Sequence, residues 1–407
     1  MVMIHDEEGN HQTEATGMTR TSIYSHSHCP EVNPLLRAVI LDLPSTVKHI
    51  LAAGVDADTR YEYGNGDITA LKAATLLQHV DVVRALIEYG VEVNGVGVGG
   101  RTILQNAVLN DQVDPDLVDL LLSAGADIDA RTPEGFTALH MATEWPGDNA
   151  AVLLQRGPAK DALDSEGRSP LHLAAEYGNP AATCALLAAG ADATLRIDSR
   201  GIDKVSPLDV AARYGHVEVI RELARHGVDM NAPPKFGNGC LHHAAAGNQA
   251  GAIDALVEAG ASIEAQSEWT TPLYSAASIG ALEATHALLR HGAPIMGLRY
   301  CGIHEISALD VAALMGNLEV ARLLLEHGVD VNDTSTTGET GLTPLHMPLV
   351  CPAADDAAVI LLRRGAAKDA ITNGGYSPLH LAAQQGRLSA ARALLAAGAD
   401  TTLRIDS

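Results

Sequence analysis

The stretch SPLHLAA occupies residues 169–175 and returns unchanged at residues 377–383, 208 positions later. Such a duplicate is either a pair of chemical sites or a structural unit whose copies stack. Its central leucine recurs in the same context, at intervals of 32 to 37 residues, which is the signature of a solenoid. The eleven leucines are Leu35, Leu71, Leu104, Leu139, Leu171, Leu208, Leu241, Leu273, Leu309, Leu345 and Leu379.

Each unit carries start and stop signals for two short helices. Ser169 can cap the first helix, and Pro170 occupies the position where a missing N–H donor costs nothing. Gly178 and Gly190 are able to adopt the left-handed conformation that ends a helix. In eight of the eleven units the closing glycine follows the leucine by 19 residues, which is enough for two helices and a tight turn.

The second helix of each unit carries a stripe of apolar residues. The residue four positions before the closing glycine is apolar in every unit, as at Leu86, Leu186 and Leu394. A single helix pair cannot bury such a stripe alone, so neighbouring pairs are expected to stack.

The iterated motif TPLHLAA…G…LL..GAD.N resembles that of the ankyrin-repeat family. The resemblance implies an all-α solenoid of about eleven stacked helix-turn-helix units with projecting hairpin loops, over residues 31–407. Residues 1–30 show no helical periodicity, and we expect a disordered N-terminal arm there. The repeats AKDA at 159 and 367, and LRIDS at 195 and 403, share the 208-residue offset and indicate an internal six-repeat duplication.

The resemblance also implies roles for the Thr or Ser and the His of the motif. In the family these side chains hydrogen-bond to the loops of their own and neighbouring repeats, so a catalytic or metal-binding role is disfavoured. The matching pairs are Thr137 with His140, Ser169 with His172, Thr343 with His346, and Ser377 with His380.

Two units depart from the pattern at the turn between their helices. Pro146 and Pro352 stand where other units have a glycine turn, and Pro348 removes an N–H donor inside a first helix. We expect both of these units to be distorted.

The charge balance restricts the class of partner. With 27 basic and 50 acidic residues the formal net charge is −23, which repels nucleic acids and anionic membranes and favours proteins with basic surfaces. The five cysteines form no CxxC pair, and neither an apolar run long enough to span a bilayer nor a secretory signal is visible. We therefore expect a cytoplasmic or nuclear protein.

Two segments imitate chemical sites. GVGVGGRT at 95–102 satisfies GxGxxG, but a phosphate cradle needs a preceding strand of a parallel sheet and a full helix behind it. HSHC at 26–29 offers three adjacent ligands, too few to close a tetrahedral metal site. Without a catalytic signature elsewhere, we predict no enzyme, no cofactor and no metal.

Three asparagines follow the second helix at one spacing. Asn94, Asn231 and Asn332 lie eight residues after Leu86, Leu223 and Leu324 and resemble sites that asparaginyl hydroxylases modify in ankyrin proteins. The alternative is that Asn supplies a turn-compatible side chain.

Binding residues are expected in the loops, because side chains at the loop tips and on the first helices of a solenoid need not pack in its core. Aromatic and Arg side chains are the commonest anchors, although packing against neighbouring loops is an equal alternative for the rings. The predicted partner-binding residues are Tyr61, Tyr63, Arg101, Phe136, Arg168, Phe236, Trp269, Tyr300 and Tyr376.

The sequence thus favours a non-catalytic scaffold or adaptor that binds partner proteins through its loop tips and concave face. Two alternatives stay open, a transcriptional co-regulator that grips a basic DNA-binding factor and the recognition arm of a larger multidomain protein. The last repeat lacks the polar outer face of a terminal repeat, so we expect self-association through it.

Overall fold

The computed structural model describes residues 33–63, 66–97, 100–110, 113–199, 203–232, 238–267, 270–295, 299–300, 304–334, 340–351 and 354–405. The predicted N-terminal arm at 1–30 lies outside these residues. The chain divides into two compact units, Met1–Asp192 and Ala193–Ser407, each built from stacked helix pairs.

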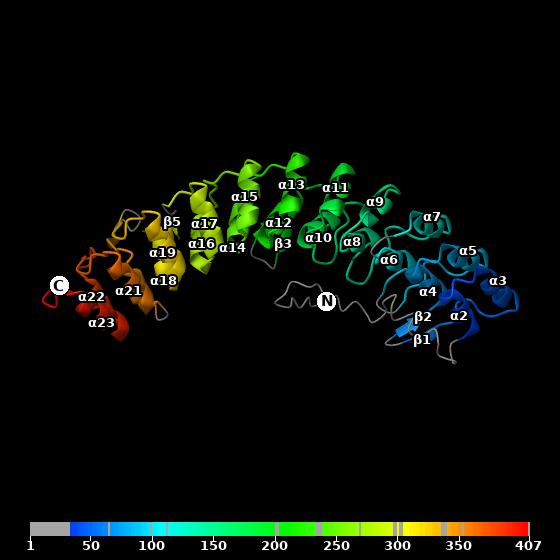
Figure 1. Ribbon diagram of the computed structural model, residues 1–407, viewed down its shortest axis with the longest axis horizontal. Helices are drawn as coiled ribbons and strands as arrows, with labels where there is room; N and C mark the ends of the chain where they lie inside the picture. Colours follow the sequence, from blue (N-terminus) through cyan, green and yellow to red (C-terminus); the bar gives the residue numbers. More distant parts are fainter. Residues whose placement is uncertain are drawn as a thin grey trace. The chain divides into compact units, whose positions relative to one another are not determined.

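In unit 1 five helix pairs follow one another in the described residues, with one hairpin between the first two pairs (Figure 1). Its elements are α2 (Pro34–Ile40), α3 (Pro44–Ala52), β1 (Tyr61–Tyr63), β2 (Gly66–Ile68), α4 (Ala70–Leu77), α5 (Val80–Glu88), α6 (Ile103–Ala107), α7 (Pro115–Ser123), α8 (Ala138–Ala142), α9 (Asn149–Leu154), α10 (Pro170–Glu176) and α11 (Pro180–Ala188).

Unit 2 carries six more pairs in its described part, and hairpins precede two of them. Its elements are β3 (Ile197–Ser199), β4 (Asp203–Val205), α12 (Pro207–Tyr214), α13 (Val217–Arg225), α14 (Cys240–Ala246), α15 (Ala250–Glu258), α16 (Pro272–Ile279), α17 (Leu282–Arg290), β5 (Arg299–Tyr300), β6 (His304–Glu305), α18 (Ala308–Met315), α19 (Leu318–Glu326), α20 (Met347–Val350), α21 (Asp355–Arg363), α22 (Pro378–Gln384) and α23 (Leu388–Ala396).

The helices form two layers within each unit. First helices pack on first helices, as α12 on α14 and α14 on α16, and second helices pack on second helices, as α13 on α15. In the described residues the strands pair as antiparallel two-stranded hairpins in the loops, with Tyr61 opposite Ile68 and Ile197 opposite Val205. The expected all-α solenoid with projecting hairpins is confirmed.

The core lies between the two layers and is made of the expected stripe. Leu86, Leu186 and Leu394 are fully buried, as are the equivalent leucines of the other units. The first pair differs, because Ile50 is half-buried and the adjacent Leu51 is fully buried in its place.

The predicted stop signals are confirmed at Gly178 and Gly190, whose φ angles are 68° and 76°. The expected distortions are also present. The unit with Pro146 has a second helix α9 of 6 residues, against 9 in α11, and the unit with Pro348 has a first helix α20 of only 4, against 7 in α10; Pro352 lies outside the described residues.

Candidate functional site

The motif residues form a reciprocal cap at the start of the first helices. The N–H of Thr137 donates to His140 Nδ1 at 3.1 Å, and the N–H of His140 donates to Thr137 Oγ1 at 3.4 Å. The same cap N–H to His Nδ1 bond joins Ser169 to His172 at 3.3 Å, Thr343 to His346 at 3.0 Å and Ser377 to His380 at 3.2 Å. Each histidine therefore satisfies a cap amide that would otherwise lack a partner.

The second ring nitrogen of His140 reaches the next repeat. Because Nδ1 accepts from Thr137, Nε2 carries the proton and donates to the carbonyl of Arg168 at 3.1 Å. Burial lowers the pKa of His140, although this hydrogen bond opposes the shift. His140 is a neutral tie between adjacent loops, in agreement with the structural role that the resemblance implied.

Other side chains take the place of this histidine in some units. Gln105 accepts from the Thr102 N–H at 2.8 Å and donates to the carbonyl of Ala130 at 2.7 Å, so it makes both types of bond. Asp209 accepts from the Ser206 N–H at 2.9 Å and pairs with Arg196 at 2.9 Å. The cap position is thus chemically variable while its geometry is kept.

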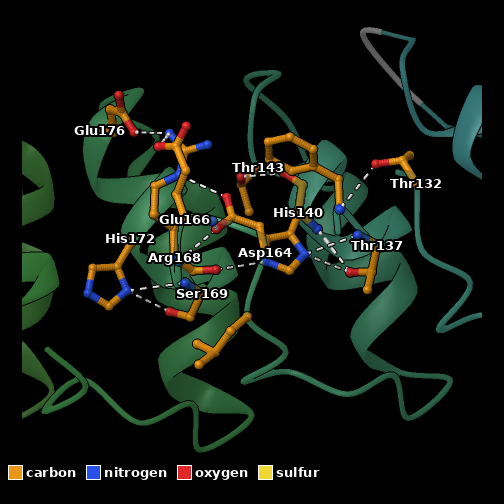
Figure 2. A network of polar contacts seen from close by, with 12 residues as sticks. Thr132, Thr137, His140, Thr143, Asp164, Glu166, Arg168, Ser169, His172 and Glu176 are labelled. Carbon is orange, nitrogen blue, oxygen red and sulfur yellow. Dashed lines mark hydrogen bonds and ion pairs between the residues drawn. The ribbon is translucent and has the colours of Figure 1, made fainter. Parts of the chain in front are cut away.

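Arg168 lies at the centre of a polar network between the fourth and fifth repeats (Figure 2). Its Nε is 2.8 Å from Asp164 Oδ2, and its Nη1 is 3.4 Å from Glu176 and 3.5 Å from Glu166. Its guanidinium carbon lies 5.7 Å from the centroid of the Phe136 ring. Burial raises the pKa of Glu176, while Arg168 opposes that shift. The charge of Arg168 is compensated by Asp164 and Glu166 of its own loop and by Glu176 at the end of α10.

The described loop anchors are partly covered. Phe136 meets the edge of the His140 ring at a centroid distance of 5.8 Å, and Tyr61, Arg101 and Tyr376 are half-buried. Burial raises the pKa of Tyr61. The side chains of Tyr63 and Tyr300, and the residues Phe236 and Trp269, lie outside the described part.

The three asparagines bridge consecutive repeats. Asn94 Nδ2 donates to the carbonyl of Gly125 at 2.8 Å, and its Oδ1 accepts from the N–H of Asp127 at 2.9 Å. The corresponding Oδ1 bonds are 2.7 Å long at both Asn231 and Asn332. These side chains supply more than turn propensity, because they tie each loop to the next.

A row of exposed side chains at the ends of first helices in unit 2 escaped the sequence analysis. Tyr214, Ala246, Ile279 and Met315 are the last residues of α12, α14, α16 and α18, four helices that pack in succession. Tyr214 is 46% exposed, Ile279 55% and Met315 53%. We call these four residues the first-helix row. In the sequence, these residues could have been found by their position directly before the glycine of the turn between the two helices.

In the described residues, the two segments that resemble chemical sites show no geometry that would bind a cofactor or a metal ion. HSHC at 26–29 lies outside them, and within them no group of three His, Cys, Asp or Glu side chains could hold a metal ion. In the glycine-rich segment the N–H of Gly97 is bonded to the carbonyl of Arg101 at 3.1 Å, and α6 behind it has only 5 residues. Burial raises the pKa of the Cys240 thiol to about 12, which disfavours its nucleophilic thiolate.

Among the described residues, no helix combines the length and the apolar character that crossing a bilayer requires.

Comparison with known proteins gives matches along most of the chain. Family models for ankyrin repeats in three copies match residues 35–132, 113–197, 265–335 and 332–405, and one for ankyrin repeats in many copies matches 208–254.

Similar proteins carry repeats in longer chains. The B-cell lymphoma 3 protein homolog of Mus musculus is 29% identical over 68% of this chain and 54% of its own length. A putative palmitoyltransferase ZDHHC13 of Danio rerio is 29% identical over 48% of this chain and 30% of its own. The chain therefore spans less than two thirds of these relatives. Among solved structures, the ankyrin repeat domain of Bcl-3 aligns at 28% identity over 56% of this chain and 99% of that one, with a TM-score of 0.46.

Proposed function

Because the chain belongs to the ankyrin-repeat family, we propose that it is a non-catalytic scaffold that binds partner proteins through its loop tips and first helices. Ankyrin repeats generally mediate protein–protein interaction, and the fold alone fixes no partner. The stacking leaves some side chains without a packing role, and those are the candidates for recognition.

The first-helix row carries this proposal. Its three large members are about half exposed at equivalent positions of α12, α16 and α18, whereas the stripe leucines of the same unit are fully buried. Exposed apolar side chains that gather on one surface are typical of protein interaction sites, and a single exposed one is not. The row is a surface on which the side chains of a partner would exclude water.

The charge of the chain favours basic partners. A net charge of −23 attracts basic surfaces over a distance and accelerates their encounter, while apolar contacts set the lifetime of the complex. We propose that these partners are met in the cytoplasm or nucleus, and that neither a membrane nor a bare nucleic acid is a ligand.

A matched pair of variants tests the scaffold. The triple variant Tyr214→Ala, Ile279→Ala and Met315→Ala is compared with Leu41→Ala plus Leu43→Ala in the turn between α2 and α3, which are 50% and 42% exposed. Affinity purification of each intact chain is followed by identification of the co-purifying proteins. Proteins lost from the triple variant and retained by the control support the row. An unchanged set of proteins refutes it.

The loop anchors are proposed as a second part of the binding face. Truncating Phe136 to Ala tests this, because an anchor loses binding while a packing residue loses stability. Thermal melts and pull-downs of the partner identified with the wild-type chain separate the two results. Loss of the contacts with Arg168 and His140 alone predicts a cost of roughly 1 to 2 kcal/mol in unfolding free energy.

The co-regulator hypothesis is favoured by the same acidic balance. A chain that grips a basic DNA-binding factor would be retained on that factor with or without DNA, and would not shift bare DNA in a gel. A shift of bare DNA would exclude this hypothesis.

Two further proposals concern modification and assembly. Asn94, Asn231 and Asn332 are proposed substrates of an asparaginyl hydroxylase, and mass spectrometry of the purified chain tests for an added oxygen. Self-association is proposed through α23, where Leu388 and Leu395 are exposed. Light scattering of the wild-type chain against Leu388→Ala plus Leu395→Ala tests it, and a monomer at all concentrations would refute it.

A further inference from the structure

Lys72 occupies an unusual position for a lysine. It is the third residue of α4, where its backbone N–H donates to the capping Thr69 Oγ1 at 3.2 Å, so it takes the place that His140 has in α8. The residue is only 9% exposed. Its Nζ lies against the backbone of Gly97, since a methyl group added there would be 3.2 Å from Nζ. The ammonium group is therefore held at the glycine-rich loop.

The same loop brings a second cation to this place. The N–H of Gly97 donates to the carbonyl of Arg101 at 3.1 Å, and the N–H of Gly100 donates to the carbonyl of Gly97 at 3.0 Å. These two bonds hold the backbone of Gly100 and Arg101 beside Gly97, the glycine that Lys72 Nζ approaches. Burial lowers the pKa of Lys72, and the charge of Arg101 lowers it further.

The two cations lack a carboxylate partner in the described part of the chain. No carboxylate oxygen there lies within 4.0 Å of Lys72 Nζ or of the Arg101 guanidinium, whereas Arg168 and Arg196 have one at 2.8 Å and 2.9 Å. The charge of Arg101 contributes to lowering the pKa of Glu134, but hydrogen bonds from the backbone of Glu134 and from Thr132 contribute more. Two neighbouring cations without a counter-ion repel each other, so a ligand that supplies negative charge would be stabilising.

We propose that Lys72 and Arg101 form an oxyanion site, which takes a phosphate or carboxylate group presented by a protein partner of unit 1. Lysine offers three N–H donors and arginine a planar fork, and both match the oxygens of these groups. The site differs from a phosphate cradle at a helix N-terminus, because side chains supply the charge. In a chain of net charge −23, one cationic position would fix the register of a mainly basic partner.

The anion affinity is tested with inorganic phosphate at constant ionic strength, by calorimetry and thermal melts of the full chain. Lys72→Met and Arg101→Gln each remove one cation, and Arg84→Gln on the exposed face of α5 is the control with the same change of charge. We expect phosphate to bind the wild type and the control alike, and each site variant about tenfold more weakly or worse. Equal affinity for all four chains, or no binding to the wild type, would overturn the site.

A second variant separates a defined site from general attraction. Gly97→Ala keeps both charges and places its methyl group against Lys72 Nζ. It should weaken phosphate binding several-fold while Arg84→Gln does not. Lys72→Met should melt no lower than the wild type, because it loses no ion pair and removes the repulsion between Lys72 and Arg101. A lowered melting temperature would show that the ammonium is paired within the fold.

The source of the oxyanion is tested with three short peptides that differ at one residue, phosphoserine, glutamate or serine. This step rests on the proposed scaffold function, whereas the phosphate titration does not. Binding of the phosphoserine peptide alone identifies a phosphorylated partner, and binding of both charged peptides identifies an acidic one. Binding of free phosphate without either charged peptide would refute the protein-borne source and leave the scaffold to be judged by the first-helix row.

Discussion

Replacing His140 tests whether the ties between loops contribute to stability through hydrogen bonds or through shape. The side chain is 1% exposed, accepts from the Thr137 N–H at 3.1 Å and donates to the Arg168 carbonyl at 3.1 Å. The chain itself suggests the conservative variant, since Gln105 at the same helical position accepts from the Thr102 N–H and donates to the Phe136 carbonyl at 3.1 Å, which precedes the next cap as Arg168 does. His140→Gln should therefore keep both bonds, and His140→Ala should lose both.

The magnitude follows from the groups that lose a partner. His140→Ala leaves the buried Thr137 N–H unpaired at about 1 to 3 kcal/mol, whereas the Arg168 carbonyl keeps its bond from the Asp164 N–H at 2.9 Å; the substitution also adds a cavity. Together these predict a loss of roughly 2 to 4 kcal/mol in unfolding free energy, against about 1 kcal/mol or less for His140→Gln.

Urea unfolding measures the overall loss, and hydrogen exchange at the Thr137 amide reports the local one, because repeat arrays do not always unfold in one step. His226→Ala is the control, since this histidine is exposed and its loss should cost no more than about 0.5 kcal/mol. Equal losses for the Gln and Ala variants of His140 would refute the reasoning and assign the role of the ring to shape.

Three further predictions concern pH, the core and the turns. Burial lowers the pKa of His140, so the unfolded chain binds more protons than the folded chain below the ordinary pKa of about 6.5. The unfolding free energy should therefore be constant above that pH and fall below it by up to about 1.4 kcal/mol per pH unit. Thermal melts of His140→Gln should show a smaller fall. Leu186→Ala should cost roughly 2 to 5 kcal/mol in urea unfolding, with exchange protection lost in the middle of the chain first, whereas the half-exposed Leu395→Ala should cost under about 1 kcal/mol. The methyl group of Gly125→Ala meets no atom within 4 Å, so this variant should cost about 1 to 2 kcal/mol in unfolding free energy, for its positive φ alone. The methyl group of Gly135→Ala lies 2.9 Å from the Ser165 nitrogen, so this variant should lower the melting temperature clearly more than Gly125→Ala does.

Local rules made the helix pairs predictable. A cap at Ser169, a proline at position 170 and glycines at 178 and 190 act within a few residues, so the letters alone define where helices begin and end. The distortion of α20 was readable for the same reason, because Pro348 changes the hydrogen bonding of its own turn.

The candidate site was only partly predictable. The sequence predicted binding residues in the loops, but it could not show that Arg168 would be enclosed by Asp164 and Glu176 and lie over the Phe136 ring. Nor could it show the first-helix row, because exposure is a property of the stack. Lys72 and Arg101 are 29 positions apart, and only the structure shows that Lys72 Nζ and the backbone of Arg101 both lie at Gly97.

The duplicated heptapeptide SPLHLAA separates what the sequence determines from what the tertiary structure alone decides. SPLHLAA alone determined that a capped first helix begins at Pro170 and again at Pro378, since the capping bonds join residues three positions apart. Yet residues 171–175 are all buried in α10, whereas in α22 the identical letters leave Leu379 and Leu381 half-buried and Ala383 exposed. Helix formation is decided within the segment, but burial depends on the side chains that pack around it, and only the tertiary structure supplies those.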